Sequence, residues 1–157
     1  MLKKRYYSIT NITSVNNDNI KKVISLREKK YRDKYKEFLV EGLREIKAAI
    51  NINAKLIELF VCEELVSQES KKIFEHFKND NNVKIFLITQ KIYSKISIRE
   101  NVDGILGVFK KTDSKSLDNL YISDSSLIII AENIEKPGNL GALLRTADAC
   151  GITAVIL

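Results

Sequence analysis

The last 32 residues of the sequence constrain its fold more than any other part. They begin and end with apolar runs, Leu127 to Ala131 and Thr153 to Leu157, which are typical of strands buried on both faces. Between these runs, the spacing of apolar side chains predicts a helix from Asn139 to Cys150. A strand, a helix and a second strand in this order predict a right-handed crossover that joins two parallel strands.

The predicted helix of this unit carries two different faces. One face, expected to pack on the sheet, consists of side chains three or four residues apart: Leu140, Leu143, Leu144 and Ala147. Gly141 and Arg145 lie one turn apart on another face, where the small glycine lets a ligand or a partner backbone approach the guanidinium. We expect Asn139 to cap this helix and Gly151 to end it.

The loop before this helix predicts a binding site for an anionic group. It lies outside the carboxyl end of a buried strand and at the amino end of a helix, where ligands bind in open α/β sheets. Asn133, Asn139 and Arg145 converge there, and their donor groups suit a phosphate. In the alternative interpretation, Asn139 only caps the helix, Asn133 is a turn residue, and Arg145 forms an ion pair with Asp148. The sequence leaves both interpretations open.

Upstream of this unit, amphipathic and apolar segments alternate. Strands are predicted at 38–40, 56–61, 83–88 and 105–109. Helices are predicted at 20–30, 43–50 and 68–77, and a short helix after the strand 83–88 extends through Tyr93. This alternation predicts an α/β fold with a mainly parallel sheet. The polar stretch 111–124 is typical of a linker, with a domain boundary near residue 120. We therefore expect an amino-terminal extension (1–19), a first domain (20–110) and the start of a second domain (125–157).

The net charge of +6 is concentrated near the amino terminus. The first 36 residues carry eleven Lys or Arg against three Asp or Glu. A basic cluster of this kind attracts polyanions and releases counterions from the phosphates it neutralises. Lys21 and Lys22 open the densest part of the cluster, and Tyr31 and Tyr35 lie within it, where they either stack on bases or pack on the domain. A solvated helix face is the alternative, and composition leaves the two equally open.

Several kinds of site and location are not indicated by the sequence. One histidine, His76, and two distant cysteines, Cys62 and Cys150, do not supply a set of zinc ligands, so we expect no metal. No phosphate loop of the GxxxxGK[ST] kind is present. The apolar runs are far shorter than the roughly 20 residues of a membrane helix, and no apolar signal segment follows the basic start. We therefore expect a cytoplasmic protein with reduced thiols and no membrane partner.

The loop and helix together resemble a known family signature. The residues from Asn133 to Gly151, NIEKPGNLGALLRTADACG, are similar to the first signature of the SpoU (TrmH) family of RNA ribose methyltransferases, part of the knotted SPOUT superfamily. The family pattern Asn-x-Gly-x-x-x-Arg-Thr-Ala is matched in full from Asn139 to Ala147. Upstream, the segments FLVEGLR (38–44), LFV (59–61) and GILGV (104–108) resemble the family's substrate-binding domain, whose fold is similar to ribosomal protein L30e.

The resemblance implies an L30e-like α/β domain followed by the first strand–helix–strand unit of a SPOUT domain. It also implies that a homodimer transfers a methyl group from S-adenosylmethionine to a ribose 2′-hydroxyl of structured RNA, either rRNA or tRNA. Carried over by position, Arg145 is the catalytic arginine. Because arginine stays protonated in proteins, we expect Arg145 to hold a phosphate and stabilise the developing alkoxide, and the general base stays unassigned. The expected RNA-binding residues are Asn133, Asn139, Arg44, Lys21 and Lys22.

In this family the donor pocket is built from strands and loops that follow the first signature. The sequence ends at Leu157, within the second strand of the unit, so the resemblance predicts no cofactor-binding residue in this chain. Two hypotheses stay open: the chain is part of a longer methyltransferase, or it is a truncated, catalytically inactive RNA-binding module. Neither the residues nor the resemblance identifies the target RNA or nucleotide.

Overall fold

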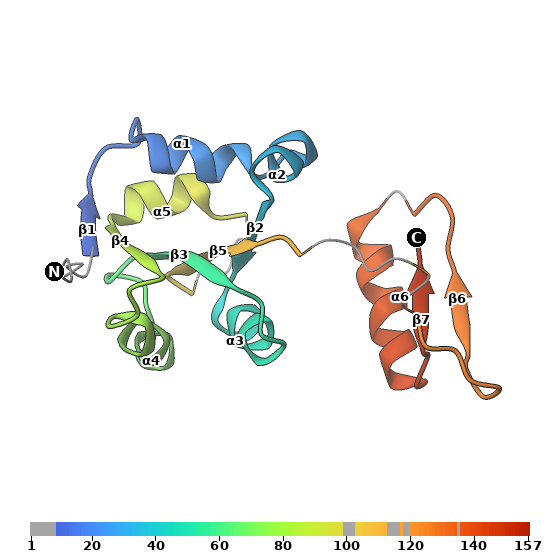
Figure 1. Cartoon of the computed structure of the whole chain (residues 1–157). Helices are drawn as coiled ribbons and strands as arrows, with labels where there is room; N and C mark the ends of the chain where they lie inside the picture. The colour runs from blue at the N-terminus through green and yellow to red at the C-terminus, as the bar shows by residue number, and fades with distance from the viewer. Residues whose placement is uncertain (1–8, 99–102, 113–116, 118–119, 135) are drawn as a thin grey trace, which may run out of the picture. The chain divides into compact units, whose positions relative to one another are not determined.

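The computed structural model describes residues 9–98, 103–112, 117, 120–134 and 136–157 (Figure 1). The chain divides into two compact units, Met1–Thr112 and Asp113–Leu157, which we call unit 1 and unit 2. The division falls inside the stretch 111–124 predicted as a linker. Each unit is described by itself.

Unit 1 contains a five-stranded sheet. In spatial order its strands are β1 (Ile9–Ile12), β4 (Lys84–Ile88), β3 (Leu56–Val61), β5 (Ile105–Lys110) and β2 (Glu37–Glu41). β1 and β3 each pair with β4 in parallel, whereas β5 is antiparallel to both β3 and β2. The sheet is therefore mixed, and the prediction of a mainly parallel sheet is wrong.

The direction of β5 follows from where that strand begins. Ile105 lies opposite Val61, and Val61 lies opposite Leu87. β5 therefore starts beside the carboxyl ends of β3 and β4. The helix before it, α5 (Gln90–Ile96), has only seven residues, and Ile98 just after it donates its N–H to Oε2 of Glu41 at 2.7 Å, at the end of the sheet where β5 starts. β5 then runs back antiparallel to β3, because a parallel strand would need a crossover that brings the chain to the amino ends of β3 and β4.

Helices cover both faces of the sheet of unit 1. In Figure 1, α5 and α1 (Asp18–Ser25) lie on one side, and α3 (Leu43–Asn51) and α4 (Gln68–Phe77) on the other. Each face has its own apolar core, in which helical and strand side chains are fully buried. The first core includes Ile20, Val23, Phe60 and Ile92, and the second includes Ile46, Leu59, Ile105 and Phe109.

Part of the segment predicted as an amino-terminal extension belongs to unit 1. Residues 9–12 form β1 at the edge of the sheet, where Ile9 lies opposite Ile85 and Ile12 packs into the first core. Asn17 then caps α1, because its side-chain oxygen accepts a hydrogen bond from the backbone N–H of Asn19 at 2.9 Å. A four-residue strand among polar residues is too short to give a clear sequence pattern.

Unit 2 is the strand–helix–strand unit that the sequence predicts. β6 (Ile128–Ile130) and β7 (Ala154–Ile156) pair in parallel, with Ile129 opposite Val155. α6 (Pro137–Ala149) connects them, and Gly151 follows the helix with a φ of +67°, in the left-handed region that ends many helices. This finding confirms the predicted α/β architecture of the segment.

The apolar residues of unit 2 are less buried than the sequence predicts. Leu127, Ile130 and Leu157 are 60%, 78% and 70% exposed, so the expectation of strands buried on both faces is wrong. Among the residues of unit 2 that the structure describes, only Ala147 is buried, because two strands and one helix enclose little volume. No helix in the described part of the chain is long and apolar enough to cross a membrane.

We expect this difference in burial to appear in hydrogen exchange. A two-stranded sheet with one helix is marginally stable, whereas the strands of unit 1 lie between two cores. In a chain of residues 1–157, the amides of β6, α6 and β7 should exchange at least about 100-fold faster than those of β3, after correction for intrinsic rates. Mass spectrometry of deuterium uptake checks this, and equal protection of the two units would contradict it.

Candidate nucleic-acid interface

In unit 2, Asn133 lies in the loop that follows β6. This residue is exposed and has a φ of +56°, in the left-handed region that asparagine tolerates better than most residues. Among the described residues, no hydrogen bond joins the Asn133 side chain to Asn139 or Arg145. The structure therefore places Asn133 in the predicted loop, with its side chain exposed to solvent.

α6 begins earlier than the sequence predicts, and its cap is different. The cap residue is Lys136, and Pro137 occupies the first helical position, where its missing N–H costs nothing. Asn139 is the third helical residue and donates its backbone N–H to the Lys136 carbonyl at 2.9 Å. The prediction that Asn139 caps the helix is therefore wrong. Its exposed side chain lies in the first turn and is free for another role.

Arg145 is exposed and lies over Gly141. Its Nη1 atom is 3.6 Å from the position that a Cβ atom on Gly141 would occupy, so the side chain folds back toward the amino end of α6. Among the residues that the structure describes, no carboxylate forms an ion pair with Arg145, so the alternative of an Arg145–Asp148 pair is wrong. The guanidinium is thus positioned near the helix turn that contains Asn139 and keeps its donors available.

In unit 1, Lys22 is an internal cation. Its Nζ atom lies 2.6 Å from Oε2 of Glu37 and 3.1 Å from Oε1 of Glu58, and its side chain is only 22% exposed. Burial lowers the pKa of Lys22, but hydrogen bonds and charge interactions with Glu37 and Glu58 outweigh burial, so the pKa is raised. The structure therefore places Lys22 in an ion-pair network with two carboxylates of the same domain, and its contact with RNA stays a prediction. Lys21 is exposed and forms a surface ion pair with Asp18 at 3.4 Å.

Two arginines of the basic cluster hold backbone carbonyls. Arg32 donates from Nη1 to the carbonyls of Leu26 at 3.0 Å and Arg27 at 2.5 Å. Arg27 donates from Nη2 to the carbonyls of Lys95 at 2.9 Å and Ser97 at 3.0 Å. The helix predicted from 20 to 30 is consequently two helices, α1 and α2 (Lys29–Tyr35), because Arg32 satisfies carbonyls at the break between them.

Aromatic and basic side chains share the surface of α2. The rings of Tyr31 and Tyr35 are stacked, with centroids 6.4 Å apart and planes at 14°. The Nζ atoms of Lys30 and Lys34 lie 4.8 Å and 5.3 Å from the centres of these two rings. None of the residues of α2 is buried, so the tyrosines do not form part of the core. Rings and cations in this arrangement suit stacking with nucleic-acid bases.

Arg44 occupies the first turn of α3. It is exposed, and the structure shows no ion-pair partner for it among the described residues. The helix start is fixed by Asp103, whose Oδ2 atom accepts a hydrogen bond from the Leu43 N–H at 3.1 Å, and by Gly42 with a φ of +97°. Within the described residues, no group of three or more His, Cys, Asp or Glu side chains is placed to hold a metal ion.

Comparison with known proteins identifies the family to which unit 1 is similar. Residues 17–107 match the family described as the MRM3-like substrate binding domain. The match covers more than half of the chain. The chain belongs to this family. The MRM3-like domain extends from the cap of α1 into β5, and it includes Lys21, the α2 surface and Arg44.

Relatives of the MRM3-like chain are RNA methyltransferases. It is 30% identical over 142 residues to a protein of Xenopus laevis named rRNA methyltransferase 3, mitochondrial, covering 88% of this chain and 33% of that protein. A crystal structure titled RNA 2′-O ribose methyltransferase matches with a TM-score of 0.78 and 34% identity, over 93% of this chain and 54% of that one. An AdoMet-bound rRNA methyltransferase from Sinorhizobium meliloti matches with a TM-score of 0.75 and 26% identity, over 94% of this chain and 53% of that one.

These matches confirm the resemblance to the SpoU (TrmH) methyltransferases that the signature between Asn133 and Gly151 indicates. The MRM3-like chain spans a third of the Xenopus relative and about half of the two solved chains. The similarity to the solved chains extends over both units, because it covers more than nine-tenths of this sequence.

Proposed function

We propose that this chain acts in 2′-O-ribose methylation of ribosomal RNA, with S-adenosylmethionine as the methyl donor. The observation that carries the proposal is the match of residues 17–107 to the MRM3-like substrate binding domain. Relatives named as rRNA and RNA 2′-O-ribose methyltransferases support the reaction and the substrate class. The AdoMet-bound Sinorhizobium meliloti structure supports the donor.

In this proposal, unit 1 binds the RNA. Its exposed cations Lys21 and Arg44 and the tyrosine–lysine face of α2 supply the two interactions that RNA-binding surfaces use, namely charge for phosphates and rings for bases. Lys22 has two carboxylate partners within the domain, so we leave it out of this surface. The binding surface is therefore smaller than the basic cluster in the sequence.

Unit 2 supplies Arg145. In the reaction the 2′-hydroxyl oxygen bonds to the donor methyl carbon and the bond from that carbon to sulfur breaks, so that the sulfur keeps the electron pair. The hydroxyl proton passes to a general base that we leave unassigned. Arg145 holds the phosphate next to the target ribose and stabilises the oxygen as it loses its proton, because a guanidinium donates two parallel hydrogen bonds and keeps its charge. Asn133 and Asn139 bind the same sugar–phosphate segment through their exposed amides.

The described part of unit 2 is small and mostly open to solvent. Its strands are three residues long, and all its described side chains except Ala147 are half-buried or exposed. We assign no donor-binding residue within this chain. We extend the proposal to a homodimer, since exposed apolar side chains such as Ile130 and Leu144 gain burial from a second copy. Light scattering of the chain in solution tests the dimer.

A substitution of Arg44 tests the RNA-binding role of unit 1. We expect Arg44→Gln to weaken binding of structured rRNA about 3–10-fold and to reduce the salt dependence of the affinity by about one phosphate contact. Lys72→Gln is the matched control, because Lys72 is an exposed cation on α4, on the same face of the sheet as α3. Fluorescence anisotropy with a labelled rRNA fragment measures both, and an equal effect of the two substitutions would exclude Arg44 from the interface.

A further inference from the structure

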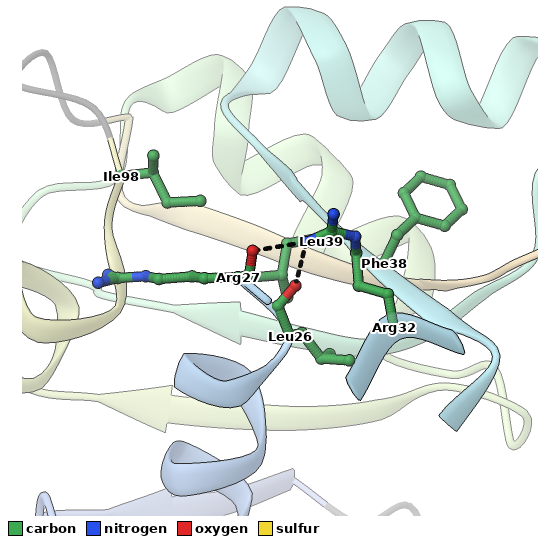
Figure 2. A pocket seen from close by; sticks show the side chains of 6 residues that line it. All are labelled: Leu26, Arg27, Arg32, Phe38, Leu39 and Ile98. Atoms are coloured by element: carbon green, nitrogen blue, oxygen red, sulfur yellow. Dashed lines mark hydrogen bonds between the residues drawn. The ribbon is translucent and has the colours of Figure 1, made fainter. Parts of the chain in front are cut away.

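A cavity of about 400 Å³ lies beside β2, the last strand on its side of the sheet (Figure 2). Its volume falls in the range of about 300–1,000 Å³ that is usual for small-molecule sites. It is lined by Leu26, Arg27, Arg32, Phe38, Leu39 and Ile98. Apolar side chains and two guanidinium groups therefore share one concave surface of unit 1, and no acidic side chain lines it.

The apolar walls of the cavity are held in place by the fold. Leu26 is fully buried, and Phe38 stacks on Phe109 with ring centroids 5.9 Å apart. Ile98, on the opposite side of the cavity in Figure 2, is 63% exposed. Its backbone N–H donates to Oε2 of Glu41 at 2.7 Å, which fixes the rim that Ile98 forms. The cavity thus presents a fixed apolar surface to solvent.

The two arginines give the cavity its positive charge. The backbone carbonyls that accept hydrogen bonds from the two arginines carry no net charge, so they do not neutralise the guanidinium groups. Among the described residues, the structure shows no carboxylate paired with Arg27 or Arg32. Figure 2 shows the Arg32 guanidinium held between two carbonyl oxygens. A guanidinium has five N–H donors. Arg27 and Arg32 each use only some of these donors for the carbonyls, so each arginine keeps other donors for an anion.

The outer edge of β2 gives the cavity one free backbone donor and one free acceptor, the N–H and C=O of Leu39. Lys111 donates its N–H to the carbonyl of Lys36, and Gly42 donates to the carbonyl of Ile105. Antiparallel pairs alternate residues that bond across the pair with residues that point away. Leu39 lies three residues from both Lys36 and Gly42, so its N–H and C=O face the open side. In the part of the chain that the structure describes, neither group has a hydrogen-bond partner.

We propose that this cavity binds one unpaired nucleotide of the RNA substrate. The base fills the apolar cavity and its edge pairs with the N–H and C=O of Leu39, while Arg27 and Arg32 bind its phosphate. The proposal rests on the proposed function in RNA binding and names the form of RNA that unit 1 selects. The stacked tyrosines of α2 support a nucleotide over an acidic peptide, because they suit a neighbouring base. A peptide strand would also need a longer free edge than five-residue β2, which α2 contacts.

A charge placed at the rim tests the proposal. We expect Ile98→Glu to weaken binding of a stem–loop RNA by about tenfold or more, with little effect on a blunt duplex of the same stem. Ile52→Glu is the matched control, because Ile52 is 79% exposed and adds the same charge away from the cavity. Both variants of the full chain should fold, since neither side chain is buried. Equal effects of the two substitutions, or equal losses on both RNAs, would overturn the proposal.

Hydrogen exchange at Leu39 provides a second readout. We expect its amide, which is free in the protein alone, to become protected when the stem–loop RNA is bound. If a glutamate-rich peptide protects this amide and the RNA does not, the cavity is a protein-binding site and the proposal is wrong. If the unaltered chain binds the stem–loop but Ile98→Glu changes nothing, only the cavity assignment fails. If the unaltered chain does not bind RNA at all, the proposed function fails with it.

Discussion

Replacing Arg145 by alanine is expected to lower the rate of methyl transfer by about 10²–10³-fold, with only a small loss of RNA affinity. Arg145 stabilises charge that develops on the reacting oxygen, and removal of one such donor has an effect of this size. Arg145 lies over Gly141, and no carboxylate of the described residues pairs with it, which leaves the guanidinium available for this role. Both the transfer of a labelled methyl group and the RNA affinity are measured.

The rate is measured in an enzyme made of this chain and the part of the Sinorhizobium meliloti methyltransferase outside the matched region. Arg145→Lys is the informative companion variant, because lysine keeps the charge and loses the bidentate geometry. Comparable losses in both variants indicate that the geometry matters, and full activity in both would exclude Arg145 from the reaction. RNA binding by the chain alone shows whether either loss comes from affinity.

Replacing Lys22 by methionine is expected to reduce the free energy of unfolding by about 3 kcal/mol. The substitution keeps the apolar stem but leaves the carboxylates of Glu37 and Glu58 without their cation, and breaking a partly buried ion group by removing one partner is strongly destabilising. Lys21→Met is the matched control. Lys21 is exposed and its ion pair is weak, so its loss should change stability by no more than about 0.5 kcal/mol.

Urea denaturation of both variants measures this difference, and its pH dependence has a definite sign. The pKa of Lys22 is raised in the folded chain above its usual 10.5. Its stabilising contribution is therefore fully present below pH 10.5 and is lost as the pH rises through the folded pKa. The gap between the original chain and Lys22→Met should shrink in that alkaline range. A gap of less than about 0.5 kcal/mol at neutral pH would contradict the structural role of Lys22.

Local patterns predicted the elements that depend on neighbouring residues. The apolar run of β3 and the amphipathic spacing of α4 were predicted with the residue limits that the structure shows. Ser67 caps α4, since its Oγ atom accepts a hydrogen bond from the Ser70 N–H at 3.1 Å. The crossover from β6 to β7 was predicted for the same reason, because each part of that unit carries its own sequence pattern.

Features set by distant residues were not predicted. Lys21 and Lys22 are adjacent and identical, yet only Lys22 meets Glu37 and Glu58, which follow much later in the chain. The break between α1 and α2 depends on how Arg32 folds back on the Leu26 carbonyl. No sequence pattern reports the direction of β5 or the free edge of β2, because both follow from how the whole sheet is assembled.

Binding of structured ribosomal RNA by the unaltered chain tests the proposed function most directly. The measurement is a titration of a folded rRNA fragment at several salt concentrations, with a DNA duplex of equal length as the control. We predict preferential binding of the RNA at low salt, weakening about tenfold or more between 50 and 200 mM salt as phosphate contacts are screened. Absence of binding at low salt, or equal affinity for RNA and DNA, would contradict the role of unit 1 as a substrate-binding domain.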